Sequence, residues 1–429
     1  MNRIILHKSK LLNTGYNYIY KFLLAIIVGL LVTEFERITL INLSLLRYLI
    51  YSLALYYFFK GIIWTYSTVN YRGFFIKSLI TILFLSIIYS IIIAIPSIFS
   101  SADNYVNFKK LLSGNFLLFL FPFILLIKTD LFVWKRIFVL SYKLSVLYLL
   151  FTIPFIVYFA TDINLGAEDF VRNFASSATI ILLTIVYHSK RVKIVTVLTF
   201  IISFLLMVLL ARRNQILYLS SIFIFLLFIM FFSSSKQIKR SKANFIVGLL
   251  FIISLSFLVI YFLNLDFSLV SERLSISARE GINYSRETVL KDFENDFNKN
   301  PADWFFGRGF NGTFFSTHCT DNFGGYVSGQ RDTIENGYYY LILKGGLLYL
   351  IPFVLLSLIG LIKGFFYSSN SLSKAAAAIV LINLIDLVGF GLPGLNLKYL
   401  TLWFSLTLCY SSQIRNCSDD LVKQIVGLK

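Results

Sequence analysis

Apolar stretches recur along almost the whole chain and are separated by short polar connections. Most are about 17–25 residues long, which is the length a helix needs to cross a hydrocarbon core roughly 30 Å thick. They are continuously apolar, as in FIVGLLFIISLSFLVIYF, and do not alternate as the strands of a membrane barrel would. The pattern predicts about twelve transmembrane helices. We place them at approximately 20–33, 42–59, 75–99, 114–128, 137–160, 173–188, 193–211, 214–232, 245–264, 336–362, 374–392 and 396–412.

The basic residues of the polar connections predict how these helices are oriented. Lys and Arg gather in every second connection and at both chain ends, as in Lys60, Arg72 and Lys77, and are fewer in the connections between. Basic residues are enriched on the cytoplasmic side of membrane proteins. We therefore expect a multi-pass protein of the cell inner (cytoplasmic) membrane, with cytoplasmic N- and C-termini. The first apolar run reads as a retained helix and not as a cleaved signal peptide.

One polar segment, residues 265–334, is much longer than an ordinary connection. The same orientation places it outside the cytoplasm, in the periplasm or the extracellular space. The predicted fold is therefore an all-α polytopic membrane helix bundle with one large extracytoplasmic loop. We divide it into 1–264 with about nine transmembrane helices, the loop at 265–334 with short helices, and 335–429 with about three more helices and a short cytoplasmic tail.

Composition supports a membrane protein and argues against several other classes. Hydrophobic residues make up 58% of the chain, charged residues 14%, and the mean hydropathy is +0.78, whereas soluble proteins carry about 25% charged residues. The net charge of +18 is explained by the Lys and Arg residues that orient the helices in the membrane. We therefore expect no nucleic acid partner. The three cysteines lack metal-ligand spacing and so predict no metal site, and we expect no cofactor.

The loop contains a helical pattern, SRETVLKDFENDFNKNP. Leu290, Phe293 and Phe297 fall on one face of this helix, and Arg286 lies on the same apolar stripe. A guanidinium there needs an anionic partner, because an isolated buried charge is costly. Arginine suits a phosphate group, so Arg286 is a candidate for anion binding. A salt bridge to a loop carboxylate, or snorkelling to water, is the alternative.

Arg212 and Arg213 interrupt a long apolar stretch between two predicted helices. A tight outside turn would explain the interruption, but arginines are disfavoured in outside turns. Charges at membrane depth are usually functional and face a cavity. We therefore favour an anion site that uses these arginines.

Glu335 and Asn336 stand at the start of the tenth predicted span, at the outer interface. Acids are common at helix N-termini for reasons of the helix dipole alone. A carboxylate at the membrane surface could instead act as a general base for a sugar hydroxyl. Asn336 could then orient either Glu335 or a substrate.

Two further features carry polar chemistry. The segment Gly307–Gly312, GRGFNG, matches a dinucleotide fingerprint in letters only, because no strand and no βαβ unit surround it. We predict a glycine-rich turn, with a backbone phosphate site as the alternative. Asp386 is an acid inside an apolar span and should be functional or paired, with no partner evident from the sequence.

The order of these features resembles the O-antigen polymerase and ligase superfamily. The resemblance rests on many spans, a large late external loop, an arginine at the span junction before it, and a Ser-Arg helix within it. The loop continues as NPADWFFGRGF and closes as IENGYYYLILKGGLLYLI, both similar to segments of that superfamily. The likeness covers residues 200–365 in detail and the rest of the chain in layout.

The resemblance implies transfer of a polyprenyl-diphosphate-linked glycan to the hydroxyl of an acceptor sugar, with membrane lipid as a further partner. The leaving group is already activated, so neither a nucleotide nor a metal is required. By position, Arg213 (or Arg212) resembles the junction arginine, Arg286 the loop arginine, and Glu335 would be the base. Arg212, Asn336 and three further residues are candidates for substrate binding. Those three are Arg279, Arg308 and Tyr338.

Three functions remain open at this point. Ligases of the superfamily typically show His-Asn where this chain has Glu335-Asn336, which favours a surface polysaccharide polymerase, with a chain-length regulator protein as a candidate partner. A ligase-type glycan transferase is the first alternative. A flippase for lipid-linked oligosaccharide is the second, although the sequence shows neither internal repeats nor matched helix interruptions.

Overall fold

The computed structural model of the 429-residue chain is mostly helical. It describes residues 2–39, 41–66, 73–99, 119–159, 171, 173, 176–209, 213–232, 282–320, 326–389 and 393–428. Within this part of the chain, five helices are long and apolar enough to cross a membrane. They cover Gly15–Glu36, Phe74–Pro96, Lys190–Val208, Gly337–Phe366 and Ser371–Val388. The expectation of an all-α membrane bundle is met at this level, and the predicted span at 245–264 lies outside the described residues.

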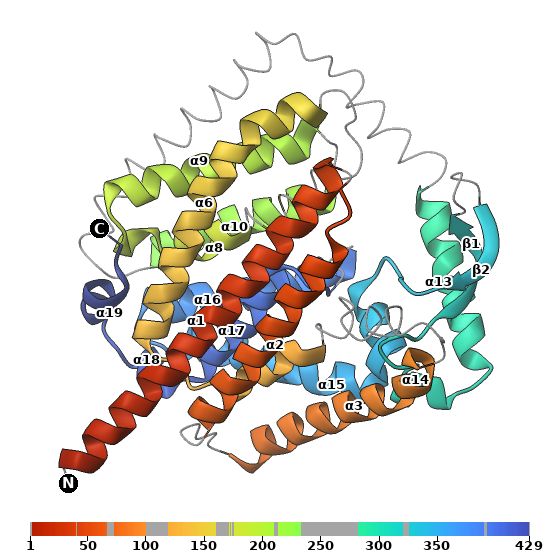
Figure 1. Ribbon diagram of the computed structural model, residues 1–429, viewed down its shortest axis with the longest axis horizontal. Helices are drawn as coiled ribbons and strands as arrows, with labels where there is room; N and C mark the ends of the chain where they lie inside the picture. The colour runs from red at the N-terminus through yellow and green to blue at the C-terminus, as the bar shows by residue number, and fades with distance from the viewer. Residues whose placement is uncertain are drawn as a thin grey trace.

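The N-terminal helices form a hairpin and a third, outlying helix (Figure 1). Helices α1 (Asn2–Thr39) and α2 (Ser44–Tyr66) pack side by side, and α3 (Phe74–Ile98) packs against a helix from the C-terminal third. Their cores are built from aliphatic and aromatic side chains such as Ile26 and Phe58. All three helices coincide with predicted spans. In an apolar surrounding, a single segment can satisfy its own backbone N–H and C=O groups only as a helix.

Two predicted spans differ from expectation. The run at 114–128 contains the short 3-10 helix η1 (Phe121–Leu126), where Pro122 lacks the backbone N–H that an α-helix would use. The run at 173–188 is divided into α8 (Ser176–Leu183) and the single turn η3 (Ile185–Tyr187). At the division, the Thr184 hydroxyl donates to the carbonyl oxygen of Ile180 at 2.6 Å. Such a side-chain bond competes with the regular helical ladder.

The other central helices lie at predicted positions. They are α6 (Leu131–Phe159), α9 (Lys190–Leu209) and α10 (Arg213–Phe232). The C-terminal third contains α15 (Gly337–Phe366), α16 (Ser371–Gly389), α17 (Leu397–Tyr410), α18 (Ser412–Arg415) and α19 (Asp419–Val426). Helix α15 contacts α3, α16 and α17, and α10 contacts α16. Trp134, Trp403 and Tyr349 are among the largest fully buried side chains of this core.

The described part of the predicted loop folds into a small module with a different composition. It consists of α13 (Ile282–Asn298), α14 (Ala302–Phe306), β1 (Phe314–Thr320) and β2 (Tyr326–Arg331). The strands pair antiparallel, with an irregularity between Ser316 and Cys319. The segment thus contains short helices, as expected, and also a β-hairpin that the all-α expectation did not include. Phe314 and Ser316 are buried whereas Phe315 is exposed, and this period of two is the pattern of a half-buried strand.

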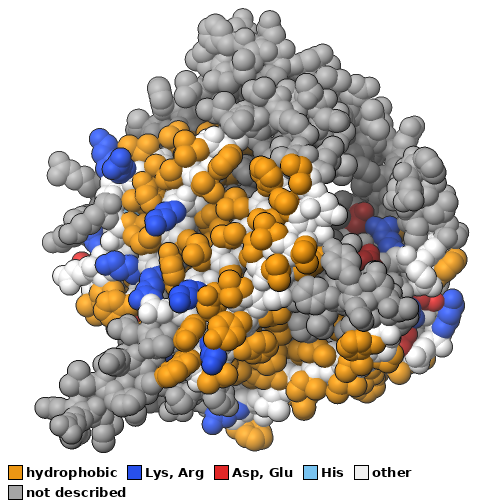
Figure 2. Space-filling model, in the orientation of Figure 1, with side chains coloured by type: hydrophobic (Ala, Val, Ile, Leu, Met, Phe, Trp, Pro, Cys, Tyr) orange, Lys and Arg blue, Asp and Glu red, His pale blue; other side chains and the backbone are white. Residues whose placement is uncertain are grey.

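The surface of the helices is that of a membrane protein. In Figure 2 hydrophobic side chains cover most of the described front face, and the Lys and Arg side chains lie mostly toward its left and lower edges. A contiguous apolar surface of this extent is not compatible with water on that face. Figure 1 shows both chain ends toward the left and the module of α13, α14, β1 and β2 at the right.

Candidate functional site

The turn before α15 places Glu335 and Asn336. Asn336 is the N-cap of α15, and its side-chain oxygen accepts from the backbone N–H groups of Tyr338 at 3.0 Å and Tyr339 at 3.3 Å. Its amide nitrogen donates to the carbonyl oxygen of Val388, near the end of α16, at 3.3 Å. Asn is among the best N-cap residues because it satisfies N–H groups that the helix leaves unpaired. The predicted orienting residue therefore holds the turn that carries Glu335.

Glu335 lies beside a basic residue at the edge of the module. Its carboxylate is 3.6 Å from the Arg331 guanidinium, and its side chain is 34% exposed. Arg331 ends β2 and also donates to the carbonyl oxygen of Thr333 at 2.8 Å. A partly exposed, positioned carboxylate can accept a proton from a bound hydroxyl group.

Two tyrosines tie this turn to the neighbouring elements. The Tyr338 hydroxyl donates to the carbonyl oxygen of Leu384 in α16 at 2.8 Å. The Tyr339 hydroxyl donates to the Glu294 carboxylate of α13 at 3.2 Å, and its ring meets the Phe293 ring edge-on. Tyr338, a candidate for substrate binding, thus has its hydroxyl bonded within the bundle. The start of α15 is held against both the membrane helices and the module.

Asp386 has a partner that the sequence did not reveal. Its carboxylate is 2.5 Å from the Lys398 ammonium, and both side chains are buried. The same ammonium lies 3.9 Å from the centre of the Tyr218 ring. Lys398 belongs to α17 and Tyr218 to α10, so the pair joins α16 to both. Charges inside a membrane bundle are costly unless paired. The sequence signal for this pair is that Lys398 follows Asp386 by twelve residues, across a short connection.

These contacts bring four helix ends together. Asp386 and Val388 lie near the end of α16, Lys398 near the start of α17, and Asn336 at the start of α15. Arg213 is the first residue of α10, five residues before Tyr218, which is about 7.5 Å along a helix. The backbone of Arg213 thus starts a helix that reaches the same cluster. Its side chain and the whole of Arg212 lie outside the described residues.

The other two arginine candidates belong to the module or its approach. Helix α13 includes Arg286, whose side chain lies outside the described residues, as does all of Arg279. The predicted apolar face of α13 is confirmed, with Val289, Phe293 and Phe297 buried. Leu290 is partly buried and packs against the same core.

Arg308 is held by partners inside the module. Its guanidinium is 2.6 Å from the Asp296 carboxylate and 2.7 Å from that of Asp303, and it donates to the carbonyl oxygen of Thr313. It also lies over the Phe297 ring. Burial by itself would raise the pKa of Asp296, but hydrogen bonds from Arg308, the Phe315 N–H and Lys299 outweigh it and lower that pKa. These contacts make Arg308 a residue that organises the module.

The predicted glycine-rich turn is confirmed and packs into a break in α15. Gly307 and Gly309 have φ of 69° and 75°, and Gly346 inside α15 has φ 66°. The Arg308 N–H donates to the carbonyl oxygen of Leu343 at 2.8 Å, and that of Gly312 to Gly309 at 2.9 Å. Since these amides are bonded within the protein, the arrangement does not favour the alternative of a backbone phosphate site.

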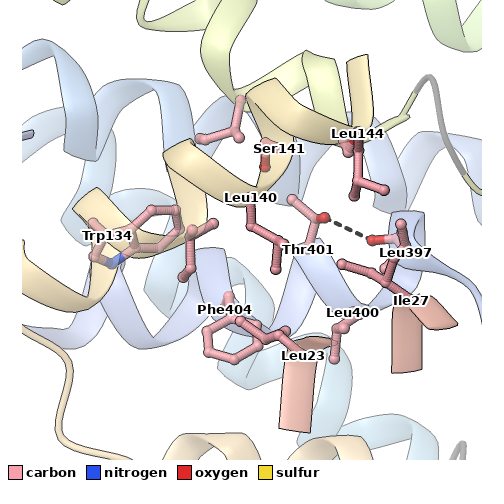
Figure 3. A pocket seen from close by; sticks show the side chains of 13 residues that line it. Leu23, Ile27, Trp134, Leu140, Ser141, Leu144, Leu397, Leu400, Thr401 and Phe404 are labelled. Atoms are coloured by element: carbon pink, nitrogen blue, oxygen red, sulfur yellow. Dashed lines mark hydrogen bonds between the residues drawn. The ribbon is translucent and has the colours of Figure 1, made fainter. Parts of the chain in front are cut away.

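A separate apolar pocket lies among α1, α6, α8 and α17 (Figure 3). Leu23 and Ile27 come from α1, Leu140 and Leu144 from α6, and Phe404 from α17. The Thr401 hydroxyl donates to the carbonyl oxygen of Leu397. The lining is mostly apolar and holds no ionisable group. Among the described residues, no group of three His, Cys, Asp or Glu side chains is placed to hold a metal ion.

Comparisons with protein-family models, with curated proteins and with solved structures found no match.

Proposed function

We propose that this chain is a membrane glycosyltransferase, a surface polysaccharide polymerase of the inner membrane. It would transfer a polyprenyl-diphosphate-linked glycan onto the sugar hydroxyl of another lipid-linked repeat unit. The observation that carries the proposal is the position of Glu335. Its carboxylate is partly exposed, lies on a turn fixed by Asn336, and stands where the membrane helices meet the module.

The proposed reaction assigns a role to each group. Glu335 accepts the proton of the acceptor hydroxyl, whose oxygen forms a bond to the anomeric carbon of the donor glycan. The bond between that carbon and the diphosphate oxygen breaks, and the electron pair leaves with the polyprenyl diphosphate. Arg213 and Arg286 stabilise the negative charge that develops on the leaving diphosphate. Arg331 orients the carboxylate of Glu335 through their ion pair.

The convergence of helix ends supports a diphosphate-linked substrate. Helices α10, α15, α16 and α17 converge at the end that carries Glu335, so a diphosphate there would lie near the start of α10. Arg213, the predicted junction arginine, is the first residue of α10.

The break in α15 does not favour the flippase alternative. Transporters often bind substrate at unwound helix segments whose backbone groups are available to the ligand. Here the glycine-rich turn fills the break, and the Leu343 carbonyl oxygen accepts from Arg308. The ligase alternative differs from the proposal only in the acceptor, so the accumulating intermediate separates the two.

The test is deletion of the gene in its host, followed by gel analysis of surface glycans. Loss of a polymerase leaves single-repeat caps in place of a ladder. Loss of a ligase leaves lipid-linked polymer, and loss of a flippase leaves lipid-linked single units on the cytoplasmic side. An unchanged ladder would contradict the proposal for that glycan.

Complementation with variants then tests the residues. We expect Glu335→Gln, Arg213→Ala and Arg286→Ala each to abolish the ladder, and loss of the base to lower the turnover about 10²–10⁴-fold. Lys291→Ala, at an exposed position on α13, is the matched control and should restore the ladder. A full ladder from both Arg213→Ala and Arg286→Ala would rule out the mechanism.

A further inference from the structure

Helix α14 exposes aromatic side chains although it belongs to the polar module. The side chain of Phe305 is 56% exposed and that of Phe306 is 41% exposed. Burying a phenylalanine is worth about 1.5–3 kcal/mol, so two adjacent exposed rings on a five-residue helix favour an apolar surrounding.

The position of α14 relative to the membrane helices is set at two points. The Phe306 ring lies 5.1 Å from the Tyr89 ring of α3. On the other side, a Cβ added to Gly346 of α15 would lie only 2.2 Å from the Phe305 carbonyl oxygen. The backbone of α14 therefore packs directly against the break in α15, and the two elements are neighbours in Figure 1.

This position lies within the apolar stripe of α3. The exposed apolar residues of α3 are Phe74, Phe75, Ile82, Leu85, Ile88, Tyr89, Ile92, Ile95 and Phe99. Phe306 meets this stripe at Tyr89, ten residues before Phe99, or about 15 Å along the helix. The stripe thus continues past α14 on both sides. The exposed apolar side chains of α3 need lipid around them along the whole stripe. Because α14 contacts the stripe part-way along, α14 lies at the same depth as the lipid.

The exposed side chains of α15 indicate a similar membrane depth for α14. Residues Tyr340 to Gly346 are buried within the protein, and an exposed apolar stripe with Leu348, Ile351 and Leu358 begins just past the break. From Leu347 to Phe366 the helix has 20 residues, which is about the 30 Å of a hydrocarbon core. The break, and α14 with it, falls at the outer boundary of that core.

The charges around α14 suit this boundary. Asp303 of α14 is paired with Arg308 at 2.7 Å, so it presents no isolated charge to an apolar surrounding. Lys299, whose side chain is 70% exposed, has the length to reach lipid phosphates or water. Tryptophan and tyrosine rings are enriched at the membrane interface, and α14 carries Trp304 beside the two phenylalanines.

We propose that α14 is an interfacial anchor, with Phe305 and Phe306 inserted at the boundary between lipid headgroups and acyl chains. The anchor continues the lipid-facing stripe of α3 and holds the module on the membrane surface. It does not depend on the reaction that the chain catalyses.

The experiment uses a nitroxide label at Phe305→Cys and, separately, at Phe306→Cys, in a full-length chain whose native cysteines are alanine. The protein is reconstituted in phospholipid vesicles, and collision with oxygen, which enters lipid, is compared with collision with a water-soluble nickel chelate. Ile92→Cys on the α3 stripe is the lipid control, and Lys291→Cys on α13 is the water control. Thermal unfolding establishes that each variant is folded.

We expect the ratio of oxygen to nickel collisions at both phenylalanine positions to match Ile92 and to exceed that at Lys291 several-fold. A ratio like that of Lys291 at both positions would place α14 in water and overturn the proposal. Loss of both collisions would also overturn it, because the rings would then be covered by protein, either a second copy or another partner. Two label positions keep the test decisive if one variant does not fold.

Discussion

At the scale of single residues, Arg308 shows how a candidate ligand residue can be occupied by its own fold. Two carboxylates of the module, those of Asp296 and Asp303, lie within 2.7 Å of its guanidinium. Both acids are mostly buried, with side chains 13% and 16% exposed. Removing the guanidinium would leave two poorly solvated negative charges close together.

We expect Arg308→Ala to lower the free energy of unfolding by about 1.5–3 kcal/mol, the range for hydrogen bonds to charged groups. Lys299→Ala removes an exposed partner of the same Asp296 and should cost below about 1 kcal/mol. Thermal unfolding of both variants in the same detergent provides the comparison. Equal effects of the two substitutions would show that Arg308 does not organise the module.

The lowered pKa of Asp296 predicts a dependence of stability on pH. The ordinary pKa of the carboxyl is 3.8, and its value in the folded protein is lower. The folded state therefore binds fewer protons than the unfolded state in this window, and stability rises with pH. The contribution is complete above about pH 3.8 and is lost as the pH falls through the lower folded value.

Unfolding midpoints at a series of pH values from about 6 down to below 3.8 test this expectation. Asp296→Asn cannot ionise and should show a weaker decline toward acid than the unmodified protein. Parallel declines in the two proteins would mean that other carboxyl groups account for the acid sensitivity.

At the scale of elements, the break in α15 and the glycine-rich turn form one joint. Gly346 has φ 66°, a conformation that other residues rarely adopt, and its α-carbon faces the Phe305 carbonyl oxygen. On the opposite side, a Cβ on Gly307 would lie 2.5 Å from the Gly346 nitrogen. Gly307 of the glycine-rich turn and Gly346 of α15 are therefore both needed at the same backbone contact.

We expect Gly346→Ala to lower the unfolding temperature and to make the segment 302–312 accessible to protease, because a Cβ cannot be accommodated against backbone. Strain of this kind costs about 1–3 kcal/mol before the steric contact is counted. Gly360→Ala is the control in the same helix, since its Cβ would meet the flexible end of Leu406. If the two variants behave alike, the close packing of the joint is not required for stability.

At the scale of the whole molecule, both chain ends lie toward one side of the helices and the module toward the other (Figure 1). The same division follows from the distribution of Lys and Arg along the sequence. The arrangement is compatible with the topology that the sequence predicts. The module would then lie outside the cytoplasm.

We expect a cysteine placed at Lys291 to react in intact cells with a maleimide that cannot cross the membrane, once the native cysteines are replaced. A cysteine at Lys374, near the start of α16, should react only after the cells are opened. Mass-tagging on a gel measures both reactions. The reverse pattern would invert the topology and remove the proposed outside site.

Patterns along the chain were enough to predict the membrane class, the positions of most helices, the apolar face of α13 and the glycine-rich turn. These follow from local patterns, because hydrophobic runs, helical periodicity and glycine content each act over a few consecutive residues. Which groups from distant parts of the chain come into contact is seen only in the folded protein. The pairing of Asp386 with Lys398, the partners of Arg308, the β1–β2 hairpin and the joint at Gly346 depend on contacts between separate elements. Such contacts are selected by packing and by the cost of unpaired charge in the completed fold, so no local pattern specifies them.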